Sequence, residues 1–370
     1  MKHTVKLILV LSLLLLPAVV FSEQKPVRIG IVGLTHDHIH GLLGRKDKGD
    51  IVIVGIAEPN QELVERHAKR YGFDKNIVYA SIEEMLRQIK PEAVMAYNDI
   101  FGHLEVVEKC APKGIHVMVE KPLAVSVAHA EKMAALAKKH KIHLLTNYET
   151  TWYGSNAEVY RVANQEKTIG EIRKIEFRTG HQGPVEIGCS KEFLAWLTDP
   201  VLNGAGALND FGCYGANIST WLMKGETPVS VMAITHTNKP QIYPKVDDEA
   251  TIVVQYPKTQ VVIQASWNWP YNRKDMQLYG ESGYVFCKDA NNMTILSSSE
   301  RKPTDTVAPA LPENHDDPFS YFANVVRGNI TPQPYDLSAL QNNEIVVKIL
   351  EAAKLSAKTG KKVVWEEYYK

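Results

Sequence analysis

Apolar and polar positions alternate along residues 27–148 in a way that predicts strands and helices in turn. Short, continuous apolar runs are typical of buried strands, and the segments between them repeat apolar residues at helical spacing. Strands that alternate with helices in this way form a parallel, doubly wound sheet, so we expect an α/β domain here. The expected strands are Val27–Val32, Ile51–Ala57, Ala93–Tyr97, Ile115–Val119 and Ile142–Thr146, and the expected helices are Asn60–Tyr71, Ser81–Ile89, Gly102–Lys113 and Ser126–Lys139.

After about Tyr148 the pattern changes to strands rich in β-branched residues, separated by longer loops. This is typical of an α+β domain with a largely antiparallel, open sheet. The polar, proline-bearing stretch Ser297–Asp317 is expected to be a long surface loop. The expected strands are Glu171–Thr179, Val229–His236, Glu249–Tyr256, Gln260–Trp267 and Gly283–Lys288, and the expected helices are Ser155–Gln165, Ala207–Met223, Phe319–Arg327 and Leu337–Thr359.

The N-terminus has the layout of a secretory signal peptide. A basic start, Met1–Lys6, leads into the apolar stretch Leu7–Leu16, and the chain turns polar at Glu23 after the small residue Ser22. The apolar stretch is shorter than the roughly 20 residues of a membrane anchor, which is the alternative. We therefore expect a signal peptide at residues 1–22 and export of the cleaved protein.

The remaining chain is expected to form two domains. The first covers residues 26–148, and the second covers residues 149–370, whose last helix packs back on the first domain.

Composition narrows the class of partner. The formal net charge is zero, so a nucleic acid or an anionic membrane is not expected as partner. The four cysteines, Cys110, Cys189, Cys213 and Cys287, include no CxxC pair, which argues against a zinc ribbon or a redox motif. They could pair in any of three ways in an oxidising compartment, and buried free thiols are the favoured interpretation.

A Glu120-Lys121-Pro122 tripeptide closes the apolar run Ile115–Val119. Proline fixes its own φ and pushes the preceding residue toward extended geometry, so Lys121 is held at the carboxyl end of a strand. Ligands of open α/β sheets bind at that edge. A lysine among apolar neighbours can have its pKa lowered enough for acid/base work. The alternative is an ordinary surface lysine in a turn.

The first strand runs into Gly33-Leu34-Thr35-His36-Asp37-His38, where a dinucleotide-binding fold needs a tight turn beside a pyrophosphate. Gly33 fits the first glycine of GxGxxG, whereas Thr35 and His38 occupy the other two glycine positions. Thr35 could replace a backbone contact with its hydroxyl, and His36 or His38 could face a phosphate or the substrate. Glu58, at the tip of the second strand, is placed to accept hydrogen bonds from a ribose diol and to repel a 2′-phosphate, which favours NAD over NADP.

The histidines of this turn also permit a different interpretation. His36, His38 and His40 alternate after a first strand, as the metal-binding HxH pair of a metal-dependent hydrolase does at a barrel mouth. The strand and helix alternation stops well short of the eight repeats of a barrel, and no second histidine pair follows a later strand. We expect no metal, and keep the hydrolase as an alternative.

A second candidate constellation follows the glycine-rich segment 204–206. Asp210 and Tyr214 are four residues apart, so they share one face of the expected helix, and Asn217 lies near that face. A carboxylate that fixes hydroxyls and a phenol that relays a proton suit the deprotonation of a carbinol. The alternative is an acidic residue that compensates the helix dipole, beside a packed tyrosine.

In chain order, the Gly33 turn, Glu58, the segment 98–103, Glu120-Lys121-Pro122 and the Asp210/Tyr214 helix resemble the Gfo/Idh/MocA family of NAD(P)-dependent sugar oxidoreductases. A tyrosine at position 214 looks more like the glucose-fructose oxidoreductase and dihydrodiol dehydrogenase branch than like the inositol-dehydrogenase-like members, in which this position is commonly histidine. The likeness continues through residues 247–250, 278–283 and 356–360.

The resemblance implies a Rossmann domain, then an α/β domain whose open sheet forms homo-dimers or homo-tetramers, with a sugar or glycoside substrate between the two. It implies catalytic roles for Lys121, Asp210 and Tyr214. The cofactor-binding residues would be Gly33, Thr35, His36, His38, Glu58, Asn98, His103, Glu120 and Lys121, and the substrate-binding residues Lys121, Trp152, His181, Asp210 and Tyr214.

The expected reaction moves hydride from a sugar carbon to nicotinamide while Lys121 and Tyr214 hold the hydroxyl. The ammonium and the positive nicotinamide would favour a phenolate on Tyr214, and Asp210 would orient neighbouring hydroxyls. An exported enzyme must hold its cofactor tightly, which favours sugar-to-sugar exchange or an NAD-dependent glycosidase or lyase that oxidises its sugar transiently. A sugar-binding protein without hydride transfer is the alternative from another class.

Overall fold

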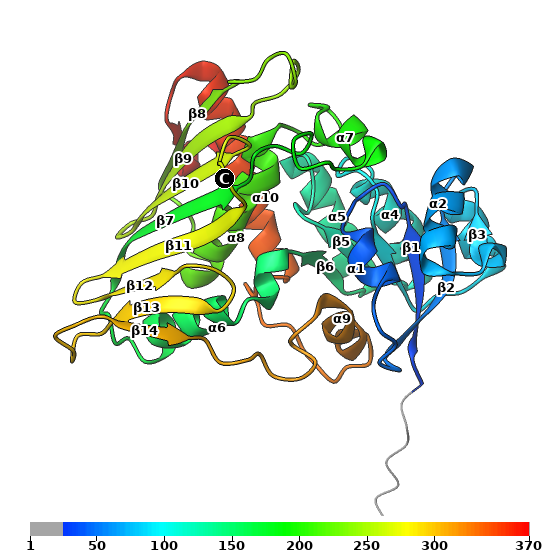
Figure 1. Ribbon diagram of the computed structural model, residues 1–370, viewed down its shortest axis with the longest axis horizontal. Helices are drawn as coiled ribbons and strands as arrows, with labels where there is room; N and C mark the ends of the chain where they lie inside the picture. Colours follow the sequence, from blue (N-terminus) through cyan, green and yellow to red (C-terminus); the bar gives the residue numbers. More distant parts are fainter. Residues whose placement is uncertain (1–24, 370) are drawn as a thin grey trace, which may run out of the picture.

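The structure is a computed structural model that describes residues 25–369, so the leader predicted at residues 1–22 lies outside it. Within the described range, no helix has both the length and the apolar character needed to cross a membrane. Two sheets stand side by side, with helices between them and on the outer face of the first (Figure 1).

The first sheet has six parallel strands in the order β3-β2-β1-β4-β5-β6. The order reverses between β1 and β4, and the carboxyl ends of strands at such a reversal open a crevice where doubly wound sheets bind ligands. The predicted parallel, doubly wound domain is confirmed. Its strands are β1 (Val27–Val32), β2 (Ile51–Ala57), β3 (Val78–Tyr79), β4 (Ala93–Ala96), β5 (His116–Glu120) and β6 (Leu144–Asn147), and its helices are α1 (Ile39–Leu43), α2 (Gln61–Tyr71), α3 (Ile82–Gln88), α4 (His103–Cys110) and α5 (Val127–His140).

The second sheet has nine strands in the order β14-β13-β12-β11-β7-β10-β9-β8-β15. Only the β7–β10 pair is parallel among them, so the prediction of a largely antiparallel sheet is confirmed. The strands are β7 (Ile172–Gly180), β8 (Ser230–His236), β9 (Glu249–Gln255), β10 (Gln260–Ser266), β11 (Arg273–Gly280), β12 (Tyr284–Cys287), β13 (Asn292–Leu296), β14 (Thr304–Val307) and β15 (Val363–Val364).

Helices α8 (Ala207–Leu222) and α10 (Leu340–Thr359) lie on the side of this sheet that faces the first domain (Figure 1). Gly215 lets α8 come close to β10, because a Cβ at this position would lie 2.7 Å from Cγ1 of Ile263. The other sheet face stays open, and Ile234 is 68% exposed on it. Further helices of this half are α6 (Gly154–Tyr160), α7 (Lys191–Leu197) and α11 (Trp365–Tyr368).

The chain returns to the first domain near its end. Helix α9 (Pro318–Val326) places Phe319 and Phe322 in the same core cluster as Ile29 and Ile31, whereas we expected only the last helix of residues 149–370 to pack on the first domain. Helix α10 also touches the first domain, because Lys354 Nζ donates to the carbonyl of Val125 at 2.7 Å. The two sheets are therefore held together by packed helices.

The sequence pattern missed several elements, of which β11 matters most because it lies in the middle of the second sheet. Its first three residues are charged, and its outward side chains are half-exposed, so it lacks the apolar run that marks a buried strand. The expected loop 297–317 contains β14 at the sheet edge.

The four cysteines are free thiols, and three of them are buried. This confirms the favoured interpretation of the cysteines over disulfide pairing.

Candidate active site

Lys121 and Asp210 form a buried ion pair between the two domains. Lys121 directly follows β5, and Asp210 lies in the first turn of α8. The lysine Nζ lies 2.5 Å from Asp210 Oδ1 and 2.8 Å from the Asp210 carbonyl, and each residue is 5% exposed. The other carboxylate oxygen accepts a hydrogen bond from Trp267 Nε1 at 2.9 Å. The structure thus brings together two of the predicted catalytic residues, and the peptide bond between Lys121 and Pro122 is cis.

The ion pair fixes the charges of both partners. Burial opposes charge on each, but the opposite charge of the partner outweighs it, so the pKa of Lys121 is raised and the pKa of Asp210 is lowered. The expectation that the pKa of Lys121 would be lowered is wrong, because it took no account of a carboxylate in contact. Lys121 is an ammonium with three N–H groups, of which two reach Asp210 and one remains for another oxygen.

Tyr214 lies one helical turn after Asp210, and Lys121 Nζ is 5.0 Å from the centroid of its ring. The side chain is 2% exposed. Burial raises the pKa of Tyr214 well above the ordinary value of a phenol, and the nearby carboxylate of Glu149 raises it further. The expectation of a phenolate on Tyr214 is therefore wrong, because burial and the neighbouring acids both oppose a negative charge on the phenol oxygen. Tyr214 is a neutral phenol that packs against Tyr148 and Phe211.

The two other predicted substrate residues have different surroundings. The ring of His181 packs edge-on against Phe211 at 4.9 Å, and burial lowers the pKa of His181 to about 4, so the imidazole is neutral. Trp152 donates from Nε1 to Asn147 Oδ1 at 2.9 Å, and its ring lies beside Tyr321. His181 therefore lies on the Asp210 side of the site, whereas Trp152 supports the end of β6.

The turn after β1 keeps the first glycine of the GxGxxG pattern, Gly33. Gly33 has φ +79°, and a Cβ there would lie 2.8 Å from the backbone nitrogen of Asn98, so the turn requires glycine. Glu58 ties this turn to β2, because its oxygens accept the N–H groups of Leu34 and Asn60 at 2.8 Å each. Glu58 is buried, and burial raises its pKa. Each carboxylate oxygen keeps a second lone pair, so the predicted contact with a ribose stays a prediction.

Two predicted cofactor residues carry unpaired acceptors at the same edge. His103 Nδ1 lies 3.1 Å from the carbonyl of Leu123 and donates to it, which leaves Nε2 as an acceptor. Nε2 of His103 and Oδ1 of Asn98 are both buried, and neither has a partner in the part of the chain that the structure describes. Buried acceptors normally have a donor. These positions fit a ligand rich in hydroxyl and amide donors, such as a nicotinamide dinucleotide.

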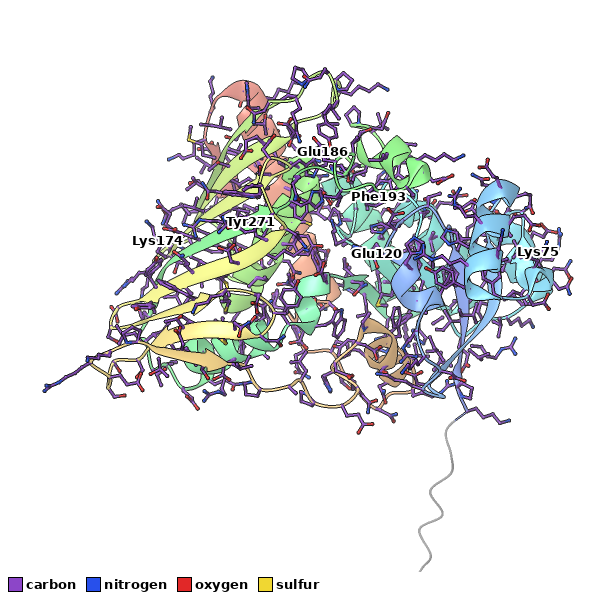
Figure 2. The ribbon with its side chains drawn as sticks, viewed as in Figure 1. Lys75, Glu120, Lys174, Glu186, Phe193 and Tyr271 are labelled. Atoms are coloured by element: carbon purple, nitrogen blue, oxygen red, sulfur yellow. The ribbon has the colours of Figure 1, made fainter. Side chains whose placement is uncertain are left out.

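Helix α7 of the second domain covers the glycine turn, and the sequence pattern did not predict this helix. The backbone N–H of Ser190 donates to Asp37 Oδ2 at 2.9 Å. The ring of His36 packs against Phe193 at 4.8 Å and Trp196 at 5.4 Å. Burial lowers the pKa of His36 well below its ordinary value, so its imidazole is neutral. Figure 2 shows Phe193 and Glu120 in the region between the two sheets.

The histidine cluster is organised by hydrogen bonds. His36, His38 and Glu120 have polar atoms within 4.8 Å of one another, the spacing of a candidate metal site. However, Nδ1 of His36 accepts the backbone N–H of His38 at 3.1 Å, so the ring hydrogen lies on Nε2 and the neutral ring offers no free lone pair. His40 contacts Tyr71 at 2.6 Å, on the side of α2. The donor set does not match the HxH metal site of the alternative interpretation.

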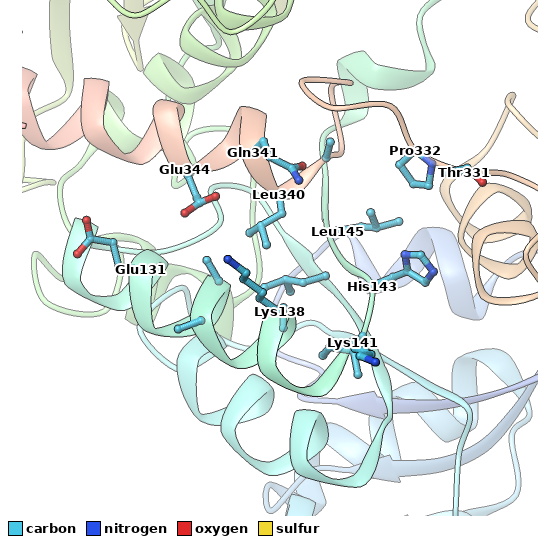
Figure 3. A pocket seen from close by; sticks show the side chains of 16 residues that line it. Glu131, Lys138, Lys141, His143, Leu145, Thr331, Pro332, Leu340, Gln341 and Glu344 are labelled. Carbon is cyan, nitrogen blue, oxygen red and sulfur yellow. The ribbon is translucent and has the colours of Figure 1, made fainter.

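A separate cavity of about 780 Å³ lies between α5, β6 and the start of α10 (Figure 3). Its lining includes Lys141 and His143, which lie in the short segment before β6 and so at the amino edge of the parallel sheet. Lys121 lies at the opposite edge. This cavity is therefore not part of the candidate active site.

Together, the fold and the site define a two-domain protein of the dinucleotide-binding class. Residues 27–148 match the oxidoreductase family with an NAD-binding Rossmann fold, and residues 160–286 match the GFO/IDH/MocA C-terminal domain. The chain therefore belongs to the GFO/IDH/MocA family of oxidoreductases, as its sequence motifs indicated.

Curated relatives and solved structures agree with this assignment. The chain is 27% identical over 221 residues to trans-1,2-dihydrobenzene-1,2-diol dehydrogenase of Xenopus tropicalis, which covers 59% of this chain and 61% of the relative. It is 21% identical to myo-inositol 2-dehydrogenase of Thermotoga maritima over 74% of this chain and 79% of the relative. The chain thus spans about three fifths of the length of the dihydrodiol dehydrogenases.

Among solved structures, aldose-aldose oxidoreductase from Caulobacter crescentus, complexed with glycerol, has a TM-score of 0.76 at 21% identity, covering 92% of this chain and 100% of that chain. An inositol dehydrogenase homolog from Azotobacter vinelandii, complexed with NAD+, has a TM-score of 0.75 at 17% identity, covering 92% and 97%. At these identities the structures support the two-domain fold.

Proposed function

We propose that this protein is an exported, NAD(P)-dependent oxidoreductase that takes hydride from a hydroxyl-bearing carbon of a sugar or sugar derivative. The Lys121–Asp210 ion pair carries the proposal. It holds an ammonium at the carboxyl edge of the parallel sheet with one N–H unassigned, and such a donor suits the oxygen of a carbinol.

Each residue of the site has a role in this proposal. Lys121 binds the reacting oxygen and favours negative charge on it, Asp210 keeps Lys121 charged and aimed, and the neutral phenol of Tyr214 borders the substrate. Asn98, His103 and the Gly33 turn would hold the dinucleotide. A bound nicotinamide supplies the hydride acceptor.

NAD is the preferred cofactor of the proposal. Glu58 places a carboxyl group at the tip of β2, where a 2′-phosphate of NADP would come close to it. We expect NAD+ to bind at least tenfold more tightly than NADP+. Binding of both to the purified protein, measured by calorimetry, tests this order.

The substrate class follows from the chemistry that the relatives' names share. A dihydrodiol, an inositol and an aldose each carry a hydroxyl next to another oxygen-bearing carbon. We therefore expect a polyhydroxylated carbinol, whose neighbouring hydroxyls would lie beside Asp210 and His181.

The test is to add aldoses, inositols and vicinal diols to the protein with NAD+ and to follow reduced nicotinamide and the sugar products together. Lys121→Met should keep NAD+ binding and lower kcat by roughly 10²–10⁴-fold, while Lys288→Met, an exposed lysine, should leave it unchanged. Cleavage of a glycosidic bond without net reduction would identify transient oxidation instead. A protein that binds sugar and no dinucleotide would contradict both redox functions.

Export is part of the proposal and rests on the leader sequence at residues 1–22. Expressed at full length in a bacterium with a general secretion system, the protein should be recovered outside the cytoplasm with an N-terminus near Glu23. Mass spectrometry of the intact protein measures this directly. An uncleaved chain in the cytoplasm would contradict export.

We also propose that the open face of the second sheet joins two or four copies of the chain. On β8, Met232 and Ile234 expose apolar side chains that a partner sheet would cover. Light scattering should show a dimer or a tetramer, and Ile234→Lys should shift it toward the monomer. A monomeric wild-type protein would contradict this assembly.

A further inference from the structure

We propose that His38 is a catalytic acid/base residue of this reaction, and that Glu120, Asn147 and Trp152 are positioning residues that aim its ring. The inference rests on the proposed function. Its basis is a chain of hydrogen bonds that crosses the edge of the parallel sheet from Trp152 to His38.

The direction of each hydrogen bond follows from the chemistry of the groups. The indole N–H of Trp152 can only donate, so Asn147 must turn its Oδ1 toward it, at 2.9 Å. The amide nitrogen of Asn147 then faces Glu120 Oε1, at 2.8 Å. Both oxygens of Glu120 therefore act as acceptors, and Oε2 receives the Nδ1–H of His38 at 2.8 Å.

This arrangement leaves a free lone pair on the other ring nitrogen of His38. With hydrogen on Nδ1, a neutral imidazole carries its lone pair on Nε2, and no described residue donates to that atom. The His38 side chain is 37% exposed, whereas Glu120 is 2% exposed. A buried carboxylate behind a partly exposed imidazole is the arrangement by which a carboxylate orients a histidine base and stabilises its protonated form.

The ring is also held from a second side. His36 accepts the backbone N–H of His38 and places its own ring 4.4 Å from the ring of His38. His36 is in turn packed under Phe193 and Trp196. The His38 ring is thus held in place at the sheet edge. A proton-transfer group must be held in this way to act on its substrate.

The site needs a group that can accept a proton, because the two other candidates, Lys121 and Tyr214, already carry theirs. Lys121 is an ammonium in contact with Asp210, and Tyr214 is a buried, neutral phenol, so neither takes up a proton at neutral pH. His38 lies in the same region as Lys121 and Tyr214. The ring of His36, 4.4 Å from that of His38, has a pKa that burial lowers first and that both His38 and Lys121 lower further, and Glu149 interacts electrostatically with both His38 and Tyr214. Lys121 would therefore bind the reacting oxygen while His38 exchanges its proton.

The proton balance of the step is simple. The O–H bond of the carbinol breaks, and its proton moves to Nε2 of His38. The hydride leaves the same carbon with its electron pair for the nicotinamide that the proposed function already requires, and the carbon becomes a carbonyl. The imidazolium then releases its proton to solvent through its exposed edge.

The first test compares His38→Ala with His40→Ala, a histidine of the same segment that contacts Tyr71 on the side of α2. Loss of an acid/base group should lower kcat by roughly 10²–10⁴-fold with little change in KM. Added imidazole should restore part of the kcat of His38→Ala, which a purely structural role would not allow. His40→Ala should behave as the wild type.

Glu120→Gln provides the second test and keeps the shape of the side chain. Asn147 still donates to Oε1, so the new amide group turns its N–H toward His38 Nδ1 and moves the ring hydrogen to Nε2. Nitrogen NMR of the protein without cofactor should show this change of tautomer at His38, and kcat should fall, although no further than in His38→Ala.

Three outcomes would overturn the inference. The first is a wild-type enzyme that is active while His38→Ala keeps its kcat, and the second is a His38 that carries its hydrogen on Nε2 in the wild type. The third is tight zinc binding that His38→Ala abolishes, which would make these residues metal ligands. Absence of nicotinamide-linked turnover in the wild type is a separate result, because it contradicts the proposed function first.

Discussion

Trp267 Nε1 donates a hydrogen bond to Asp210 Oδ2 over 2.9 Å, although Trp267 follows β10 and Asp210 lies in the first turn of α8. This contact and the Lys121 ammonium occupy both oxygens of the carboxylate. Asp210 therefore joins the second sheet to the first domain, and the stability of the whole protein depends on its contacts.

The indole hydrogen bond can be isolated by mutation. Trp267→Phe removes a donor to a charged group, which costs about 1.5–3 kcal/mol beyond the loss of ring volume. Trp196→Phe is the matched control, because Trp196 is also buried and its Nε1 has no partner among the described residues. Urea unfolding should show Trp267→Phe as the less stable variant by that difference. Equal losses would show that the hydrogen bond contributes nothing.

Breaking the ion pair should cost more. Asp210→Asn keeps the shape of the side chain but leaves Lys121 as an unpaired buried charge, and such changes cost about 3–5 kcal/mol. Adding Lys121→Met to this variant removes the unpaired charge and should recover part of the loss. The exposed Lys288–Asp305 pair is the control, and Asp305→Asn should leave the urea midpoint unchanged. A double variant less stable than Asp210→Asn would contradict this account.

The glycine turn allows a comparison of two effects. Gly33 and Gly72 both have positive φ, +79° and +74°, but only at Gly33 would a Cβ meet other atoms. Gly72→Ala should therefore cost only the conformational term, about 1 kcal/mol. Gly33→Ala should cost clearly more and weaken NAD+ binding, as measured by unfolding and calorimetry. Similar costs for the two variants would show that the turn relaxes around the methyl group.

Acid should weaken the contact between α9 and the first domain. Burial opposes the charge of Asp50, but hydrogen bonds from Arg45 and Ser320 outweigh it and lower its pKa to about 2. Because this value lies below the unfolded pKa of about 3.9, the contribution to stability is present above pH ~4 and is lost as pH falls toward 2.

The contribution of Asp50 is at most about 2 kcal/mol, since the shift is about two pKa units and the pair is partly open to solvent. Asp50→Asn should therefore be less stable than the wild type at pH 7, and the two should converge near pH 2. Urea unfolding at several pH values measures this. A difference that is the same at pH 7 and pH 2 would contradict the assignment.

The sequence by itself determined the first domain, the class of the second and the family. Buried parallel strands are continuous apolar runs, so β1, β2, β4, β5 and β6 are readable without any tertiary information. Motif order then predicted a common site for Gly33, Lys121 and Asp210, of which the structure brings Lys121 and Asp210 into contact. The pattern of apolar and polar residues did not predict β11 and α7. One face of each element is half-exposed, so apolar and polar residues are mixed along it and no clear apolar run marks the element.

Only the tertiary structure decided the chemistry of the site. A pKa depends on which charges and how much protein surround a group, and those neighbours come from distant parts of the chain. Contact with Asp210 therefore makes Lys121 an ammonium, burial makes Tyr214 a neutral phenol, and the chain from Trp152 to Glu120 directs His38. The sequence named these residues, but their charges and hydrogen-bond partners were set when the two domains packed together.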